Sequence, residues 1–181
     1  MSKVLIIKGY GQDNHLGKLV LDKLNDFFND INISDLDENE IKSCTGCDYC
    51  QKINPGICCM NDKMGAVLSE YLESELVFII SPISFGCINT ITKNFIDRTE
   101  PLFLPYQVKK KKRIVMMPRY DKYPKLIFVV LTDKKNESEI TSFQEIVINS
   151  NLSLTSPEVK TVILSCEDDL VFLIDAKEGM V

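Results

Sequence analysis

Cysteines are the residues of this chain best suited to chemistry, and five of the seven lie close together in the first third of the sequence. Cys44, Cys47, Cys50 and Cys58 follow the spacing C-x2-C-x2-C-x7-C, and Pro55-Gly56 predicts a turn before the fourth cysteine. Three thiols three residues apart, with a fourth returned by a turn, can converge on one point. Compact four-cysteine sets of this kind are typical of an iron–sulfur cluster.

Two other interpretations of the cysteine loop, residues 44–59, stay open. Zinc is the next metal to consider, although structural zinc sites usually pair two C-x2-C knuckles across a longer loop. The loop could also hold reduced thiols without any metal. Seven is an odd number of cysteines, so complete disulfide pairing within one chain is excluded. We expect Cys59, Cys87 and Cys166 to stand outside the ligand set.

The size and charge of the chain limit its class. Its 181 residues predict a single domain, 1–181, that is long enough for a sizeable core. A formal net charge of −5 disfavours a nucleic-acid partner. The one basic run, residues 109–113, is interpreted as a solvated loop, with an anion contact as the alternative.

The cellular compartment is predicted from the cysteines together with the lack of a secretory signal. The first residues lead directly into the apolar run Val4–Ile7, which is too short for a secretory signal. No apolar run approaches the length of a membrane span, so we expect no membrane partner. Reduced cysteines without a secretory signal indicate the cytoplasm.

Apolar runs and helical spacings alternate along the chain, as in an α/β domain with a mostly parallel sheet. Continuous β-branched runs indicate strands that are buried on both faces. The strands are expected at 4–7, 31–36, 76–80, 126–131 and 161–164, with 31–36 at an edge. Helices are expected at 16–31, 62–72, 88–98 and 140–147.

Local signals refine these bounds and leave two segments open. Asn61 is predicted to cap the second helix, and Pro82 should end the third strand because proline cannot donate to a sheet ladder. Residues 105–124 are interpreted as a long, poorly defined loop that could contain a short strand at 113–117. The apolar residues 170–174 are too few to predict a closing helix and could pack on a partner.

The predicted topology brings candidate loops together. We expect Val4–Ile7 at the centre of the sheet, and ligands of open α/β sheets bind at the carboxyl ends of the strands. The loops after Ile7 and Ile80 should be neighbours there, and the cysteine loop, which also follows a strand, should lie on the same edge. Strand, glycine turn and helix, as at Gly9 to Leu16, can bind an anion. His15 is either a surface residue at the helix start or a phosphate donor.

Several of these segments together resemble the flavodoxin-like NAD(P)H-dependent FMN reductases and, among them, the iron–sulfur flavoproteins. The similarity covers about the first hundred residues in order. The segments that carry it are Lys3-Val4-Leu5-Ile6-Ile7-Lys8-Gly9, Cys-x-Gly-Cys-x-x-Cys from Cys44 to Cys50, Asn61-Asp62-Lys63-Met64, Ser81-Pro82-Ile83-Ser84-Phe85-Gly86 and Thr92-Lys93-Asn94-Phe95-Ile96-Asp97-Arg98.

The resemblance implies a three-layer fold, a cofactor and a partner class. The fold would be a flavodoxin-like sandwich with a five-stranded parallel sheet in the order 2-1-3-4-5. A four-iron cluster would bind Cys44, Cys47, Cys50 and Cys58, NAD(P)H would be the co-substrate, and the chain would form a homodimer or homotetramer. FMN would contact the loops after the first and third strands: Gly9, Tyr10, Gly11, Gln12, Asn14, His15, Leu16, Ser81, Pro82, Ile83, Ser84, Phe85 and Gly86.

Two positions depart from the family pattern and predict weaker FMN binding. The phosphate loop usually carries Gly-Ser-x-Arg, whereas here the hydroxyl donors are missing and Asp13 adds a negative charge. Ser84 stands where the flavin-side loop usually has an aromatic residue.

The functional hypothesis is a flavin-dependent oxidoreductase in which FMN passes electrons from NAD(P)H to a small acceptor, or to a cluster or protein partner. The alternatives are a flavodoxin-like binding or regulatory protein that has lost FMN, and a zinc-stabilised domain. A single histidine without a nucleophile motif disfavours hydrolysis, and the sequence assigns no catalytic residue.

Overall fold

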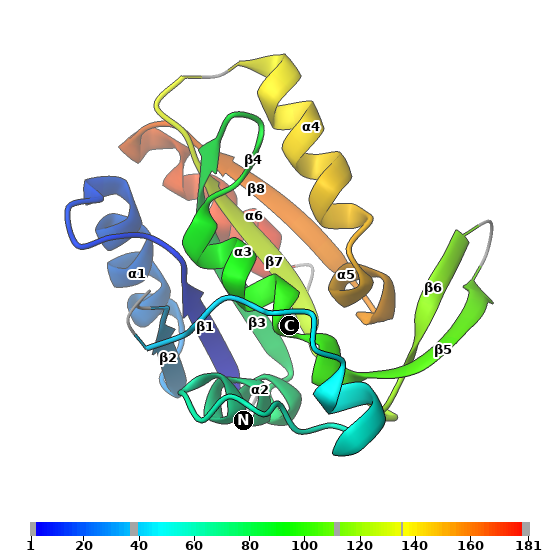
Figure 1. Cartoon of the computed structure of the whole chain (residues 1–181). Coiled ribbons are helices and arrows are strands. Elements are labelled where there is room, and N and C mark those ends of the chain that lie inside the picture. The colour runs from blue at the N-terminus through cyan, green and yellow to red at the C-terminus, as the bar shows by residue number, and fades with distance from the viewer. Residues whose placement is uncertain (1–2, 37–39, 111–112, 135, 179–181) are drawn as a thin grey trace.

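A computed structural model of the chain describes residues 3–36, 40–110, 113–134 and 136–178. Its main sheet has five parallel strands in the order β2-β1-β3-β7-β8 (Figure 1). Counted along the chain, these strands have the predicted order 2-1-3-4-5, and the flavodoxin-like fold is confirmed. The strands are β1 (Val4–Lys8), β2 (Ile31–Asp35), β3 (Leu76–Ser84), β7 (Lys125–Leu131) and β8 (Val159–Leu164).

The central strand is β3 and not, as expected, the strand that contains Val4–Ile7. β1 lies between the edge strand β2 and β3, whereas β3 has β1 on one side and β7 on the other. A continuous apolar run indicates that a strand is buried on both faces of the sheet. Every interior strand has this property, so the run does not identify the central strand.

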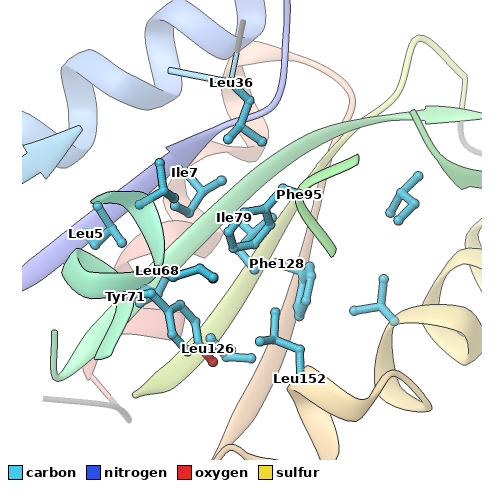
Figure 2. Packing of buried hydrophobic residues seen from close by; sticks show 14 of the residues in the cluster. Leu5, Ile7, Leu36, Leu68, Tyr71, Ile79, Phe95, Leu126, Phe128 and Leu152 are labelled. Carbon is cyan, nitrogen blue, oxygen red and sulfur yellow. The ribbon is translucent and has the colours of Figure 1, made fainter. Parts of the chain in front are cut away.

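Helices cover both faces of the sheet. Alternation along each strand divides the core: Leu5 and Ile7 face the α2, α3, α4 and α5 side, whereas Val4 and Ile6 face the α1 and α6 side. Figure 2 shows the first of these two layers, with Tyr71 of α2 and Phe128 of β7 among its members. The helices are α1 (His15–Phe27), α2 (Met64–Glu73), α3 (Thr90–Asp97), α4 (Glu137–Ile148), α5 (Asn151–Thr155) and α6 (Val171–Glu178).

The third strand continues beyond Pro82, although proline cannot donate to a sheet ladder. Pro82 is the last residue of β3 to pair with β7, opposite Leu131. Beyond it, β3 turns back in a short antiparallel pairing with β4 (Cys87–Ile88). Phe85 and Gly86 make the turn with positive φ angles of 50° and 71°. A missing N–H is tolerated at such an end, since few ladder bonds depend on it.

Several predicted helix bounds shift. The first helix ends at Phe27, and Ile31 already begins β2. Lys63, and not Asn61, occupies the N-cap position of α2. Ile88 lies in β4, and α3 is capped by Asn89, whose side-chain oxygen accepts a hydrogen bond from the Thr92 amide at 3.0 Å.

Residues 105–124 are not a long loop. They contribute to an antiparallel hairpin of β5 (Phe103–Lys110) and β6 (Arg113–Pro118), which projects from the domain (Figure 1). The predicted short strand at 113–117 is confirmed. The strand β5 was not predicted because it contains Pro105. This proline is tolerated because it lies at an irregularity in the pairing, where a missing N–H is harmless. Of the basic run, residues 111 and 112 lie outside the described residues.

The apolar residues 170–174, too few to predict a closing helix, do lead into one. Residues 171–174 form the first half of α6, whose Leu173 and Ala176 are buried against the sheet. Short helices of this kind are stabilised by packing and not by propensity, so their sequence signal is weak. Within the described part of the chain, no helix is long and apolar enough to cross a membrane.

Candidate functional site

The loops after β1 and β3 meet at the carboxyl edge of the sheet, as predicted. They line a cavity of about 550 Å³ together with the ends of β7 and β8. Its lining residues are Asp13, Asn14, His15, Leu16, Leu19, Pro82, Ile83, Leu131, Thr132, Asp133, Ser165, Cys166 and Glu167. We call this space the carboxyl-edge cavity.

The start of α1 faces this cavity. The Asn14 side-chain oxygen accepts a hydrogen bond from the Gly17 amide at 2.7 Å and thereby caps the helix. The amides of His15 and Leu16 belong to the first turn of α1, where N–H groups have no acceptor within the helix. Such an N-terminus attracts anions, and both residues line the cavity.

Tyr10 and Gly9 support the loop from beneath instead of lining the cavity. The Tyr10 side chain is buried under α1, and its hydroxyl donates to the Gly17 carbonyl at 2.7 Å. Burial, followed by the charges of Asp35 and Asp22, raises the pKa of Tyr10 to about 12. The Gly9 amide donates to the Ile80 carbonyl at 2.9 Å, and a Cβ added at Gly9 would lie 2.0 Å from an atom of α3.

The other predicted flavin contacts divide in the same way. Pro82 and Ile83 line the cavity, whereas Ser81 is fully buried and Phe85 is fully exposed. Gly11, Gln12, Ser84 and Gly86 are not among the lining residues. Sequence reasoning missed Thr132, Asp133, Ser165, Cys166 and Glu167. The signal was present, because these residues directly follow the last two predicted strands.

The charge of the carboxyl-edge cavity is unusual for a phosphate site. Asp13, Asp133 and Glu167 line it, and among its described lining residues His15 is the one side chain that can become cationic. The described residues of the basic run, Lys109, Lys110 and Arg113, are not among its lining residues. Backbone amides could hold a phosphate here, but three carboxylates oppose a dianion.

The cysteine loop folds through tight turns. Gly46 and Asp48 have positive φ angles of 65° and 57°, and a one-turn helix, η1 (Tyr49–Ile53), follows them. The predicted turn at Pro55-Gly56 is present: the Gly56 amide donates to the Cys50 carbonyl at 2.9 Å, and Gly56 has a φ of 88°. This turn returns Cys58 toward the first three cysteines.

The four predicted ligands line one cavity of about 620 Å³, which we call the cysteine cavity. Cys44, Cys47, Cys50 and Cys58 all belong to its lining, whereas Cys59 does not. The other lining residues are Thr45, Gly46, Asp48, Gln51, Met60, Ile96, Asp97, Arg98, Thr99, Glu100, Phe103, Met116, Ser150, Asn151 and Leu152. Cys59 instead places its sulfur 3.7 Å from that of Cys47.

These thiols surround a space and do not meet at a point. Among the described residues, no three side chains of the metal-binding types are close enough to hold a single metal ion. A zinc ion needs four ligand atoms at about 2.0–2.3 Å. A four-iron cluster is itself a bulky group whose thiolate ligands are spread around it, so a cavity bordered by four cysteines matches it better.

A buried ion pair forms one wall of the cysteine cavity. Arg98 is 2% exposed and binds Asp62 through both terminal nitrogens, at 2.7 and 2.9 Å. It also donates to the Lys42 carbonyl at 2.7 Å and to the Cys58 sulfur at 3.5 Å. Sequence reasoning missed this pair. The signal was the spacing of Ile91, Phe95 and Arg98, which puts the arginine on the apolar face of α3.

The thiols of the loop differ in acidity. The Tyr49 amide, followed by the Thr45 hydroxyl, lowers the pKa of Cys47, whereas the contact with Cys47 raises the pKa of the Cys59 thiol. Burial raises the pKa of Cys50 to about 11. Burial opposes ionisation of Asp62 as well, but the hydrogen bonds from Arg98, Lys42 and Met64, together with the charge of Arg98, outweigh it and lower the pKa of that carboxyl.

The two cavities do not lie at one edge of the sheet, contrary to the sequence-based expectation. They share no lining residue. After β2 the chain crosses the α3 face to η1, near the base of the hairpin (Figure 1). The end of α3 lines the cysteine cavity, and a crossover helix runs antiparallel to its strands, so this cavity lies toward their amino ends.

A third and wider space, of about 1420 Å³, lies beneath the hairpin and beside the first residues of β7 and β8. Lys110, Arg113 and Lys125 line it together with Glu75 and Glu158. Charges of both signs alternate there, and the cysteines and the glycine loop take no part in it.

Sequence comparison gives two curated relatives. An iron–sulfur flavoprotein from Archaeoglobus fulgidus is 32% identical over 100 residues, which are 54% of this chain and 48% of the relative. An iron–sulfur flavoprotein from Methanocaldococcus jannaschii is 29% identical over 76 residues, 42% of this chain and 38% of the relative. The matched part of the chain thus spans about half the length of the first relative and 38% of the second. No protein-family profile matches it.

Structural comparison agrees with the fold. An NAD(P)H:quinone oxidoreductase from Methanothermobacter marburgensis superposes with a TM-score of 0.72 at 13% identity, covering 98% of this chain and 94% of the other. An azoreductase from Bacillus anthracis gives a TM-score of 0.65 at 15% identity and covers 99% of both chains. At such identities the likeness concerns the fold alone. Together with the curated relatives, it confirms the resemblance to iron–sulfur flavoproteins and flavodoxin-like reductases.

Proposed function

We propose that this protein is a flavin-dependent oxidoreductase that uses FMN to pass electrons from NAD(P)H to an acceptor. The observation that carries the proposal is the carboxyl-edge cavity, where the glycine loop after β1 meets the loop after β3 at the edge of a flavodoxin-like sheet. Ligands of open α/β sheets bind at this position. The similarity to two iron–sulfur flavoproteins over 54% and 42% of this chain supports it.

The residues of the carboxyl-edge cavity have distinct roles in this proposal. The amides of His15 and Leu16 and the imidazole of His15 would face the phosphate. Pro82 and Ile83 would lie along the ring system. Asn14 holds the helix start in place, while Gly9 and Tyr10 fix the loop from below. Gly11, Gln12 and the residues from Ser84 to Gly86 would contact FMN through parts of the loops outside the cavity lining.

The cysteine cavity would hold a four-iron cluster on Cys44, Cys47, Cys50 and Cys58. All four thiols border it, and one buried N–H group of Arg98 has no partner among the described residues. Such a donor fits a ligand rich in sulfur acceptors. When bound, FMN would accept a hydride from the nicotinamide and the cluster would carry single electrons. The thiols must lose their protons to bind, so loading should release protons.

The acceptor would be a small molecule or an electron-transfer protein, and neither nucleic acid nor a membrane is expected as a partner. The chain would act as a homodimer or homotetramer. Seven unpaired cysteines fit a reducing, cytoplasmic environment.

An anaerobic reconstitution tests the proposal. Purified protein would be loaded with FMN, ferrous iron and sulfide and desalted. The absorption spectrum would then be recorded before and after NADH or NADPH is added. We expect two flavin bands, a broad shoulder from the cluster, and bleaching by one of the nucleotides. A protein that retains neither chromophore contradicts the proposal.

The acidic lining of the carboxyl-edge cavity favours one alternative, a flavodoxin-like binding or regulatory protein that has lost FMN. Titration with FMN, followed by flavin fluorescence, separates the two. Asp13→Ser removes one carboxylate and should tighten binding by up to about tenfold, equivalent to about 1.4 kcal/mol. Asp26→Ser, an exposed change near the other end of α1, is the matched control. Absence of binding by the wild type and by Asp13→Ser would support the alternative.

A further inference from the structure

Arg98 is the most completely buried charged side chain of the described chain that borders a candidate site. It is 2% exposed, and its side chain lines the cysteine cavity. Burying a guanidinium costs several kcal/mol unless its charge and its N–H groups are satisfied. The arrangement of its donors should therefore report what the residue does.

Four of its five N–H groups have partners. One terminal nitrogen donates to the Lys42 carbonyl and to Asp62, each at 2.7 Å. The other donates to Asp62 at 2.9 Å and to the Cys58 sulfur at 3.5 Å. The fifth donor, on Nε, is buried without a partner among the described residues. One rigid, planar guanidinium thus carries both the donor to the Cys58 sulfur and the unpaired donor on Nε.

Stability alone does not explain this arrangement. Buried ion pairs can often be replaced by apolar residues without loss of stability, so such a pair is weak evidence for a purely structural role. A structural arginine would also be expected to satisfy every buried donor. Here one donor is directed to a proposed ligand and another lacks a partner beside the same cavity.

We infer that Arg98 is a positioning residue of the proposed cluster, which holds Cys58 and raises the reduction potential through hydrogen bonding to sulfur. The inference rests on the proposed function, because it requires a cluster in the cysteine cavity. Asp62 fixes the guanidinium and compensates most of its charge. Hydrogen bonds to the sulfurs and the local net charge are among the factors that set cluster potentials.

The physical reason lies in the charge of the cluster. Reduction adds an electron to a group that already carries four thiolates, so a nearby N–H donor or positive charge stabilises the reduced form more than the oxidised form. Loss of the Arg98 donor should therefore lower the potential. Loss of the Asp62 charge should raise the potential, because the guanidinium would no longer be compensated by that carboxylate.

The experiment compares midpoint potentials of anaerobically reconstituted full-length variants, titrated with a reductant and followed by absorbance and by electron paramagnetic resonance. In Arg98→Lys we expect the reduced cluster to lose about tenfold in relative stability, a shift of about 59 mV downward for one electron. In Asp62→Asn we expect an upward shift. Arg119→Lys is the matched control, because Arg119 is a partly buried arginine that donates to the carbonyls of Pro101 and Phe103 instead.

Opposite shifts distinguish the inference from simple loosening of the loop, which would move both variants alike. Should a single variant fail to fold, the double variant Arg98→Met with Asp62→Leu leaves no buried unpaired charge and should still show the lower potential. A wild-type protein that takes up no iron and sulfide overturns the proposed cluster and this inference with it. A loaded wild type whose potential is unchanged in Arg98→Lys and in the double variant overturns this inference alone.

Discussion

The cysteines of the loop have equivalent places in the sequence pattern but different surroundings in the fold. Cys58 contacts the guanidinium of Arg98, Cys50 is partly buried, and Cys44 is exposed. Cys47 is exposed as well and has a neighbouring thiol in Cys59. Spacing identifies a set of thiols, whereas their contacts decide how each one reacts.

We expect oxidation of cluster-free protein to join Cys47 to Cys59, because their sulfurs are already 3.7 Å apart. With oxidised glutathione, the two thiols lose two protons and two electrons through a mixed disulfide, and two molecules of glutathione are released. Tryptic mapping should give a cross-linked peptide in the wild type and in Cys58→Ser. The same cross-link in Cys59→Ser would contradict the assignment.

The pKa of Tyr10 predicts the response of the glycine loop to alkaline pH. Because burial raises it to about 12 from an ordinary value near 10, the folded state binds this proton more tightly than the unfolded state. The resulting stability is complete below pH 10 and is lost as the pH rises toward 12, by up to about 1.4 kcal/mol per pH unit.

Tyr10→Phe should remove this part of the pH dependence. It also loses the hydrogen bond to the Gly17 carbonyl, so at pH 8 we expect about 1 kcal/mol less stability. Urea unfolding at pH 8, 10 and 11 measures both effects, with the exposed Tyr106→Phe as the control. Equal slopes for wild type and Tyr10→Phe above pH 10 would show that Tyr10 does not ionise on unfolding.

Strands and helices of this chain are predictable from the sequence where their packing requires a regular pattern of apolar residues. β3 is apolar at every position from Leu76 to Ile80, and β7 at every position from Leu126 to Leu131, because helices cover both faces. β2 alternates and lies at the edge, where Ile33 is 46% exposed. The hairpin β5–β6 pairs only with itself, and its largely exposed strands carry polar and proline residues that hid them.

Burial predicts which strand residues carry stability. Phe128 of β7 is fully buried between β3 and β8, and Phe128→Ala should lower the free energy of unfolding by about 3–5 kcal/mol. Ile114 lies in β6 but is 72% exposed, so Ile114→Ala should change it by less than about 0.5 kcal/mol. Chemical denaturation followed by circular dichroism measures both. Similar losses in the two variants would mean that the hairpin is part of the core.

The molecule as a whole separates its two candidate sites. The carboxyl-edge cavity is built from loops that follow β1, β3, β7 and β8. The cysteine cavity is built from η1, the end of α3, the hairpin and α5. Their linings have no residue in common, so each can be filled or emptied without direct contact with the other.

We therefore expect the two sites to load independently. Cys50→Ser should abolish the cluster while changing the dissociation constant for FMN by less than about threefold, below 1 kcal/mol of coupling. Fluorescence titration with FMN, with and without prior cluster reconstitution, measures this coupling. Cys166→Ser is the contrasting variant, because Cys166 lines the carboxyl-edge cavity. Strong loss of FMN binding in Cys50→Ser would show that the cavities communicate.

The sequence alone determined where the buried strands lie and that four cysteines share one loop, since both depend on residue types at short separations, whereas the strand order came from the resemblance to a known family. Tertiary structure decided where the cysteine loop lies, which flavin-loop residues face the cavity, and that Arg98 meets both Asp62 and Cys58. The contacts of Arg98 join residues 36 and 40 positions apart, whose pairing depends on how helices pack across the sheet. Local periodicity reports that a side chain is buried, whereas only the packed fold determines what it is buried against.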